Sequence, residues 1–391
     1  MKVISIGRAD YSIFQHSSEE ARRIASYGEC FEYLFVVVFA NQRAGFSRIM
    51  IAENVEVIPT NSRWRFFYPI DAYLIAKRIF QTTSLNTTNF VITAQDPFEV
   101  GLIGCALKRR FGIPLQLQIH TDFLSPYFWR ESFKNKIRVL LARFLIPRAD
   151  GIRVVSERIT NQLKTKNYKL KTDPVVLPIF VNIEQIRATI ITTDLHKKYP
   201  QFDFIILIAS RLTREKNIKM AIEAMRLMRD PNSTNKHPND LNILLLIVGD
   251  GPELKTLKLQ TTNYKLQTNI IFEPAVDFET LVSYYKTADL FLLTSNYEGY
   301  GRTVIEAAAA GCSVVMTDVG IAGEIIHNDE SGIIVPVGNA DAIATAISTL
   351  CRNTVLRTKF MSSGHYNIEK KVVKDKTHYV KLYCETLLRI V

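Results

Sequence analysis

The sequence lacks any apolar run long enough for a membrane-spanning helix. Its longest apolar runs, such as residues 243–248, are far shorter than the roughly 20 residues that cross a bilayer. The first residues already have the pattern of a strand, without a basic leader that is followed by a long apolar stretch and a cleavage site. We therefore expect a cytoplasmic protein with no secretion signal and no transmembrane helix.

Cysteine is also scarce, with five in 391 residues. The cysteines lie far apart, mostly among apolar neighbours, and none has the paired spacing of a metal site. This pattern is typical of small buried thiols in a reducing compartment. The five residues are Cys30, Cys105, Cys312, Cys351 and Cys384.

The sequence has none of the usual nucleic-acid modules. It contains no zinc-finger spacing, no RNP-like aromatic motif and no heptad repeat behind a basic region, so we expect no nucleic-acid partner. Its net charge of +11, from 49 basic and 38 acidic residues, favours other polyanions through long-range attraction. Phosphate-bearing ligands and anionic lipid both fit this charge.

The pattern that is present indicates an α/β fold. Short β-branched runs alternate with amphipathic helical stretches, which is typical of parallel sheets built from βαβ units. The hydrophobic (47%) and charged (22%) fractions are ordinary for a folded globular protein. Strands are predicted at residues 3–6, 34–39, 55–58, 90–93, 115–119 and 152–155, and again at 204–209, 243–248, 269–272, 290–293, 313–316 and 332–335.

The chain is long enough for two domains, because a single core usually stops growing below this length. We assign residues 1–182 to an N-terminal Rossmann-like domain and residues 183–369 to a second one. Residues 370–391 are predicted as a C-terminal helix that packs back on the first domain.

Two local patterns carry further structural predictions. A helix is expected over residues 97–111, because Asp96 is placed to cap it, Pro97 suits its first position and Gly112 suits its exit. The polar, proline-containing residues 230–240 predict a surface loop in the second domain.

Ligands of open parallel sheets bind beyond the carboxyl ends of the strands, so candidate site residues are expected at the strand exits. The predicted strand 204–209 is followed by a basic loop with Arg211 and Lys216. Arg211 offers a planar fork of donors and Lys216 a compact charge, a combination that suits a diphosphate. Read alone, the loop also fits a solvated basic surface.

The predicted strand 243–248 runs into a glycine-rich turn. Gly249 and Gly251 permit a tight turn through which backbone can approach a ligand, and Pro252 is expected to start a helix. The same residues also fit a plain connection between a strand and a helix.

The segment after the predicted strand 290–293 is the most informative. Gly299 and Gly301 allow a sharp turn, and the following helix points its N–H groups and positive dipole end at that turn, which makes an anion site. Glu298 precedes the turn and Glu306 lies about two turns inside the helix. One carboxylate can therefore meet a sugar and the other a ribose. A glutamate pair at this spacing also occurs by chance.

In the first half, His120 follows the predicted strand 115–119. This position puts an imidazole at the mouth of the first sheet. A histidine at a strand end is often a structural residue, and its candidacy as a catalyst rests on facing the site of the second domain.

Three segments together resemble the donor-site motifs of glycosyltransferase family four, also described as glycosyl transferases group 1. They are residues 210–217 (SRLTREKN), 249–253 (GDGPE) and 298–307 (EGYGRTVIEA). The resemblance is strong from about residue 204 to 350 and looser in the first domain. It implies a GT-B fold, in which two Rossmann-like, doubly wound domains face a central cleft. It also implies a retaining hexosyltransferase that uses a nucleotide-diphosphate sugar as co-substrate, without a cofactor.

The resemblance also implies a role for each matching residue. Arg211 and Lys216 would bind the donor diphosphate, whereas Glu298 would bind the sugar hydroxyls. Glu306 would bind the ribose hydroxyls. The predicted catalytic residues are His120, Glu298, Arg211 and Lys216, and the predicted donor-binding residues are Gly249, Gly251, Gly299, Tyr300, Gly301, Thr303, Val304 and Glu306. No metal ligand is predicted, since the chain has no Asp-x-Asp motif.

Two positions depart from the family pattern. Residues 7–11 contain one glycine where many members carry a glycine-rich loop, which leaves the placement of the acceptor open. Pro274 stands where a glycine is common, so the nucleobase pocket is expected to differ.

Residues 127–148 form a basic amphipathic pattern that includes Trp129, Phe133 and Lys134. Such a helix can lie at an anionic membrane surface, and it can also pack its apolar side on the first sheet. A membrane contact would suit a peripheral enzyme at the inner membrane face, in glycolipid or polysaccharide biosynthesis.

The sequence therefore favours transfer of a sugar to a glycan or lipid-linked acceptor. Two alternatives stay open. One is a nucleotide-sugar epimerase or phosphorylase of the same fold, and the other is a non-catalytic protein that binds nucleotide sugars or anionic surfaces.

Overall fold

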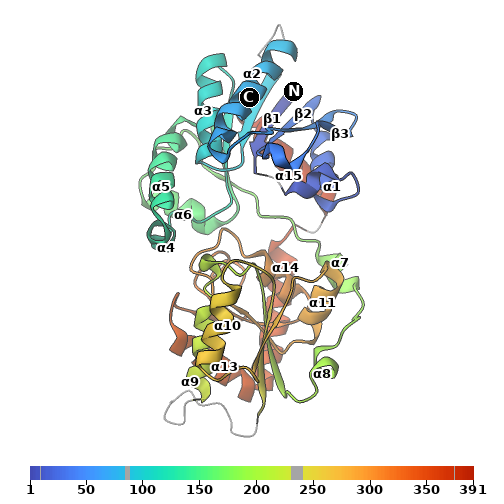
Figure 1. Ribbon diagram of the computed structural model, residues 1–391, viewed down its shortest axis with the longest axis vertical. Coiled ribbons are helices and arrows are strands. Elements are labelled where there is room, and N and C mark those ends of the chain that lie inside the picture. The colour runs from blue at the N-terminus through green and yellow to red at the C-terminus, as the bar shows by residue number, and fades with distance from the viewer. Residues whose placement is uncertain (9, 84–88, 230–240, 374) are drawn as a thin grey trace. The chain divides into compact units, whose positions relative to one another are not determined.

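The computed structural model describes the chain except for residues 9, 84–88, 230–240 and 374. The chain divides into two compact units, the first formed by Met1–Pro178 with Asp375–Val391 and the second by Ile179–Lys374 (Figure 1). The sequence places this boundary between residues 182 and 183. The loop predicted at residues 230–240 lies outside the described residues.

The sheet of the first unit has eight strands in the order β3-β4-β2-β1-β5-β6-β7-β8. All neighbours pair in parallel except β3, which runs antiparallel to β4. The six predicted strands are confirmed, whereas β3 and β8 were not predicted, because they are short and only partly buried. The strands are β1 (Lys2–Gly7), β2 (Tyr33–Val38), β3 (Ile49–Ala52), β4 (Val55–Pro59), β5 (Phe90–Ala94), β6 (Leu115–Ile119), β7 (Gly151–Val154) and β8 (Val175–Val176).

Helices cover both faces of this first sheet (Figure 1). On one face α3 packs against α2 and α5, and on the other α1 packs against α15. The helices of the unit are α1 (Glu19–Gly28), α2 (Tyr68–Thr83), α3 (Glu99–Phe111), α4 (Pro126–Glu131), α5 (Phe133–Leu145), α6 (Glu157–Thr165) and α15 (Lys376–Leu388).

Local capping sets two helix boundaries that differ from the predictions. Helix α3 begins at Glu99 rather than at Pro97, because the Asp96 carboxylate accepts hydrogen bonds from the backbone N–H of Phe98 (2.8 Å) and Val100 (3.3 Å). The helix predicted over residues 127–148 is two helices, α4 and α5. It breaks at Ser132, which is extended and whose hydroxyl accepts from the next helix.

The second sheet has six parallel strands in the order β11-β10-β9-β12-β13-β14. All six strands predicted for this half are confirmed. They are β9 (Phe204–Ala209), β10 (Ile243–Val248), β11 (Ile270–Glu273), β12 (Leu290–Leu293), β13 (Ser313–Thr317) and β14 (Ile333–Val335).

Helices α9, α10 and α13 lie on one face of this sheet, and α7, α8 and α11 lie on the other (Figure 1). The helices of the unit are α7 (Ile183–Ala188), α8 (Leu195–Lys198), α9 (Lys219–Arg229), α10 (Leu254–Asn263), α11 (Phe278–Thr287), α12 (Arg302–Ala309), α13 (Ala340–Arg352) and α14 (Thr354–Lys371). No helix in the described part of the chain is both long enough and apolar enough to span a bilayer.

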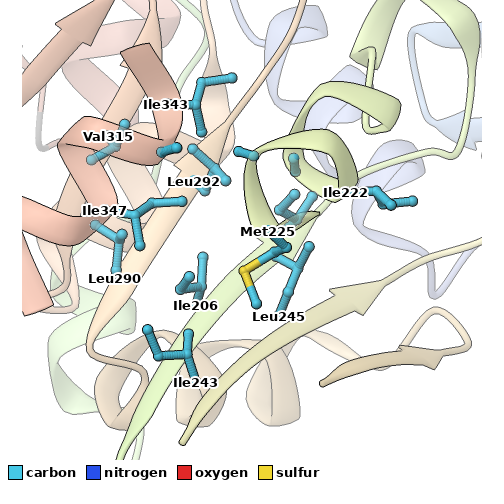
Figure 2. Packing of buried hydrophobic residues seen from close by; sticks show 14 of the residues in the cluster. Ile206, Ile222, Met225, Ile243, Leu245, Leu290, Leu292, Val315, Ile343 and Ile347 are labelled. Atoms are coloured by element: carbon cyan, nitrogen blue, oxygen red, sulfur yellow. The ribbon is translucent and has the colours of Figure 1, made fainter. Parts of the chain in front are cut away.

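The core of the second unit packs strand side chains against helices α9 and α13. Figure 2 shows Ile206, Leu245 and Leu290 of three neighbouring strands beside Met225 and Ile347 of these helices. All five are almost completely buried, and each contributes about 1.5–3 kcal/mol by leaving water. The strands are thereby held rigidly, and so are the loops at their carboxyl ends.

The C-terminal helix α15 belongs to the first unit, and buried polar contacts hold it there. Gln116 donates to the Thr386 backbone carbonyl (2.8 Å) and hydroxyl (3.0 Å), and Arg153 donates to the Tyr379 hydroxyl (2.9 Å). The helix starts at Lys376 rather than at residue 370, because α14 continues to Lys371.

A disulfide joins Cys30 to Cys384 of α15. The prediction of five free thiols is therefore wrong for this pair, although Cys312 and Cys351 are buried thiols and Cys105 is half-buried. The two bonded cysteines are 354 residues apart, so only the docking of α15 beside α1 brings them together. No local pattern signals such a pairing.

The disulfide can be tested by counting the free thiols of the protein. We expect three alkylated cysteines when the protein is denatured without reductant and five after reduction. Cys384→Ala should lower the free energy of unfolding by about 2–4 kcal/mol, because the crosslink no longer restricts the unfolded chain. Cys105→Ala is the matched control that removes one free thiol. Five alkylated cysteines before reduction would contradict the bond.

Candidate functional site

Three loops at the carboxyl ends of β9, β10 and β12 form the candidate site of the second unit. The loop after β9 and the segment after β12 are hydrogen-bonded to each other. The Asn296 N–H donates to the Glu215 carbonyl (2.7 Å), the Asn217 amide donates to Asn296 Oδ1 (2.8 Å), and the Thr294 hydroxyl donates to the Lys216 carbonyl (2.8 Å). These bonds join two predicted motifs that are about 80 residues apart into one rigid surface.

Lys216 and Glu298 meet on this surface. Lys216 Nζ lies 2.5 Å from Glu298 Oε1, and the Ser295 hydroxyl donates to the same oxygen at 2.7 Å. Both charged side chains are mostly buried, so their attraction is only weakly screened. The structure therefore brings these two predicted site residues into direct contact.

Arg211 has a different setting on the same loop. Its side chain is exposed and makes an ion pair with Glu215 at 3.1 Å. An exposed pair of this kind contributes at most about 1 kcal/mol, so the guanidinium can exchange Glu215 for an anionic ligand.

The glycines after β10 are required by close backbone packing. Gly249 has a positive φ of 139°, and a Cβ there would lie 2.0 Å from the Ser210 carbonyl oxygen. A Cβ on Gly251 would lie 2.4 Å from the Leu212 carbonyl oxygen. This turn thus packs against the loop after β9, while its contact with a donor stays a prediction. Helix α10 begins at Leu254, so Pro252 is not its first residue as predicted.

The turn before α12 presents a helix N-terminus. Gly301 occupies the cap position with a φ of 99°, and it provides no side chain to cap the first N–H groups. The side chains of Tyr300 and Val304 are buried and Thr303 is half-buried. Tyr300 and Val304 can therefore reach a ligand through the backbone only, and the helix dipole favours an anion at this end.

Glu306 lies in the second turn of α12, closer to the helix start than predicted. Its Oε1 accepts from Arg302 Nε at 2.6 Å, and its Oε2 accepts from the Tyr285 hydroxyl at 3.3 Å. Burial, followed by the Glu306 charge, raises the pKa of Tyr285 well above its ordinary value, so this hydroxyl stays a donor. The Arg302 side chain is half exposed, so a ligand hydroxyl can compete with it for the carboxylate.

His120 belongs to the first unit and directly follows β6. Its Nε2 lies 2.9 Å from Gln118 Oε1, which also accepts from Arg153 Nη1 at 2.9 Å. Because that oxygen is an acceptor, Nε2 of His120 carries the hydrogen and Nδ1 is left with a lone pair. Burial, and then the charges of Arg153 and Arg23, lower the pKa of His120 to about 3. The imidazole is therefore neutral at physiological pH.

Sequence reasoning missed two residues that shape the site. Asn217 adopts a left-handed backbone (φ 49°), which asparagine tolerates better than most residues. Asp250 accepts from the Ala275 N–H at 3.1 Å and so ties the β10 turn to the exit of β11. An asparagine after a Lys and an aspartate between two glycines are turn signals that could have identified both.

Glu273, at the end of β11, is the centre of another polar cluster. Lys198 and Tyr284 donate to it at 2.6 and 2.7 Å, and Tyr199 also donates to it. Burial acts to raise the pKa of Glu273, but the hydrogen bonds from these three residues outweigh it, and the pKa is lowered. Among the described residues, no three His, Cys, Asp or Glu side chains gather as the ligands of a metal ion would.

Most of the chain matches two families of known proteins. Residues 193–365 match the family described as glycosyl transferases group 1, and residues 34–185 match the family described as glycosyltransferase family 4. The alpha-monoglucosyldiacylglycerol synthase of Streptococcus pneumoniae is 24% identical over 306 residues, which are 74% of this chain. The match spans 65% of that synthase, slightly less than two thirds of its length.

Two solved structures share the fold over nearly their whole length. Sucrose-phosphate synthase from Thermosynechococcus elongatus has a TM-score of 0.77 and 17% identity, covering 99% of this chain and 98% of that one. HepE of Anabaena, in complex with UDP-glucose, has a TM-score of 0.72 and 20% identity, with 100% of both chains covered. At identities of 17% and 20%, this likeness shows a shared fold only.

The state of His120 leads to a pH prediction. Below its ordinary pKa of about 6.5 the unfolded chain takes up a proton at this residue, whereas the folded chain does not until pH approaches 3. Protons then favour unfolding, so stability should fall as the pH drops from 6.5 towards 4. His120→Gln should make this fall shallower, measured as the melting temperature against pH, while His16→Gln on an exposed loop should not. Equal slopes in all three proteins would contradict a neutral, half-buried His120.

Proposed function

The chain belongs to glycosyltransferase family four, and from this membership we propose that it transfers a sugar from a nucleotide-diphosphate sugar to a glycan or lipid-linked acceptor. Its fold is GT-B, as the sequence predicts, and it is an enzyme of the glycosyltransferase class. We further propose that the transfer retains the anomeric configuration and needs no metal ion.

The joined loops after β9 and β12 carry this proposal. They hold the ammonium of Lys216 against Glu298 beside the N-terminus of α12. A diphosphate meets the cations and the helix end, and the sugar hydroxyls donate to the carboxylate. One small surface therefore offers complementary groups to both halves of a nucleotide-diphosphate sugar.

The same groups suit the chemistry of transfer. The bond from the anomeric carbon to the diphosphate breaks, and a bond to an acceptor hydroxyl oxygen forms, while the hydroxyl proton passes to the departing phosphate oxygen. Arg211, Lys216 and the helix end stabilise the negative charge that develops on the leaving diphosphate. Lys216 and the helix end are held in place before the reaction, so we propose that no metal ion is needed for this task.

A lipid-linked acceptor is supported by the surface of α5. Four apolar side chains follow one another at helical spacing and are each at least half exposed: Phe133, Ile137, Leu140 and Phe144. This apolar side therefore does not pack on the sheet. Lys136 and Arg143 are exposed on the same helix. We propose that this face lies on an anionic membrane, which makes the enzyme peripheral. The cytoplasmic location stays a sequence-based prediction, and the disulfide removes the cysteine pattern as an argument for it.

The two glutamates provide the test of the donor site. Glu306→Ala should weaken binding of both UDP and UDP-glucose, because the ribose partner is gone. Glu298→Ala should leave UDP binding nearly unchanged and reduce transfer or donor hydrolysis. Each lost charged hydrogen bond corresponds to roughly 10- to 150-fold in the affected constant, measured by calorimetry and initial rates.

Arg302→Ala is the matched variant for this test, since it removes the internal partner that a ribose would replace. It should bind UDP as well as the unaltered protein does, or more tightly. All assays are run in EDTA, and turnover that depends on added Mn²⁺ or Mg²⁺ would contradict metal independence. If both glutamate variants stay folded, bind UDP and turn over normally, the donor-site assignment is wrong.

The membrane contact is tested separately by sedimentation with vesicles of phosphatidylglycerol and phosphatidylcholine. Binding should be strong at low salt and weaken as salt rises, because screening shortens the reach of the basic side chains. Phe133→Ser combined with Leu140→Ser should abolish it, since both side chains would insert among the lipids. The control is Val355→Ser, an exposed apolar residue of the second unit. Equal pelleting of all variants would exclude α5 as the membrane contact.

A further inference from the structure

The first unit has its own topological switch point. Strands β2 and β5 flank β1 on opposite sides, so the connections after β1 and β5 leave in different directions. Ligands of open α/β sheets bind in the crevice that this divergence leaves at the carboxyl ends of the strands. Arg8 directly follows β1, and Glu99 begins the helix that follows β5.

A cavity of about 670 Å³ opens at this point, and its charge is unbalanced. Arg8, Arg65 and Lys134 line it together with a single carboxylate, Glu99. Glu99 is shared among Arg8 (3.3 Å), Lys134 (3.8 Å) and Arg138 (3.0 Å). Two of these cations, Arg8 and Lys134, line the cavity with Glu99, and Arg65 is the third cation in its lining.

Burial and the neighbouring positive charges both affect Lys134. Burial lowers its pKa most, the charge of Arg138 lowers it next, and Arg8 and Arg65 have smaller effects. The attraction of Glu99 does not cancel these effects. A bound anion would relieve the repulsion among the cations, so the cavity is electrostatically suited to a negatively charged group.

The remaining walls of the cavity are largely aromatic. Tyr11, Phe39, Phe66 and Tyr68 contribute to them, and the Arg8 guanidinium lies 5.9 Å from the centre of the Phe39 ring. A phosphate ion alone fills a small part of such a volume. Cavities of about 300–1,000 Å³ with apolar walls and a few charged groups are typical of sites for whole organic ligands.

We propose that this cavity binds the acceptor through a phosphate group of the acceptor, held by Arg8, Arg65 and Lys134, while the aromatic walls hold its hydroxyl-bearing part. The inference rests on the proposed function, because it names the class of substrate that the transferase modifies. The phosphate belongs either to a soluble sugar or polyol phosphate or to a lipid headgroup. Lys134 lies on α5, next to the exposed Phe133, so both sources are compatible with the position of the cavity.

The first experiment titrates the full chain with sn-glycerol 3-phosphate and with glycerol. Tryptophan fluorescence is a suitable readout, because both tryptophans, Trp64 and Trp129, lie in the first unit and Trp64 adjoins Arg65. We expect saturable binding of the phosphate compound and none of glycerol. Arg8→Gln and Lys134→Gln should each weaken that binding at least about tenfold, because each removes a charged hydrogen bond.

Matched controls lie beside the altered residues. Lys136→Gln is on the same helix as Lys134 but outside the cavity, and Arg63→Gln is two residues before Arg65. Both should bind sn-glycerol 3-phosphate like the unaltered protein. Equal effects of cavity and control variants, or equal affinity for glycerol and its phosphate, would overturn the proposal.

A second arm identifies the source of the phosphate. Two kinds of phosphatidylcholine vesicle are mixed with the protein at high salt. One contains phosphatidic acid and the other contains neutral diacylglycerol. If the protein prefers phosphatidic acid and Arg8→Gln abolishes that preference, the phosphate belongs to a lipid headgroup. If Arg8→Gln weakens the binding of sn-glycerol 3-phosphate but does not change vesicle binding, the acceptor is soluble. No effect on either overturns the inference. UDP binding is measured in parallel by calorimetry, so that a failure of the donor site is distinguished from a failure of this cavity.

Discussion

Parallel pairing of buried strands is the constraint on which the rest of this structure depends. Apart from β3, every strand of both sheets runs in the same direction as its neighbours, so the loops that leave the carboxyl ends gather at one edge. All the candidate residues of the second unit lie on such loops or on the helices that begin there. The core below them, formed by strands such as β9 and β10 with helix α9, holds the loops in place.

The carboxylates of both sites are paired with cations before any ligand arrives. Lys216 holds Glu298, Arg302 holds Glu306, and Arg8 and Lys134 share Glu99. A charge left alone in a partly buried site costs several kcal/mol, so such pairing stabilises the ligand-free protein. It also means that binding is an exchange of partners, in which a phosphate or a hydroxyl replaces part of an internal ion pair. Selectivity then depends on how well the ligand replaces the lost contacts.

In the first unit, helix α15 is firmly anchored, whereas helix α5 has an exposed apolar side. The buried contacts of α15 and the Cys30–Cys384 bond anchor the end of the chain to its own beginning. The network that fixes α15 through Arg153 is the one that orients His120 through Gln118, so the C-terminal helix and the imidazole depend on the same hydrogen bonds. The apolar side of α5, in contrast, faces outwards.

The sequence by itself determined the strands of both sheets, the glycine turns and the likeness of three strand exits to one family, because these depend on residue periodicity and on local backbone chemistry. Gly249 and Gly301, for example, are recognisable since few other residues tolerate their positive φ. Only the tertiary structure decided the partners of Glu298 and Glu306, the tautomer of His120, the exposed side of α5 and the bond between Cys30 and Cys384. Each of these depends on which surfaces of distant segments come to lie together, and helical or strand periodicity contains no information about that choice.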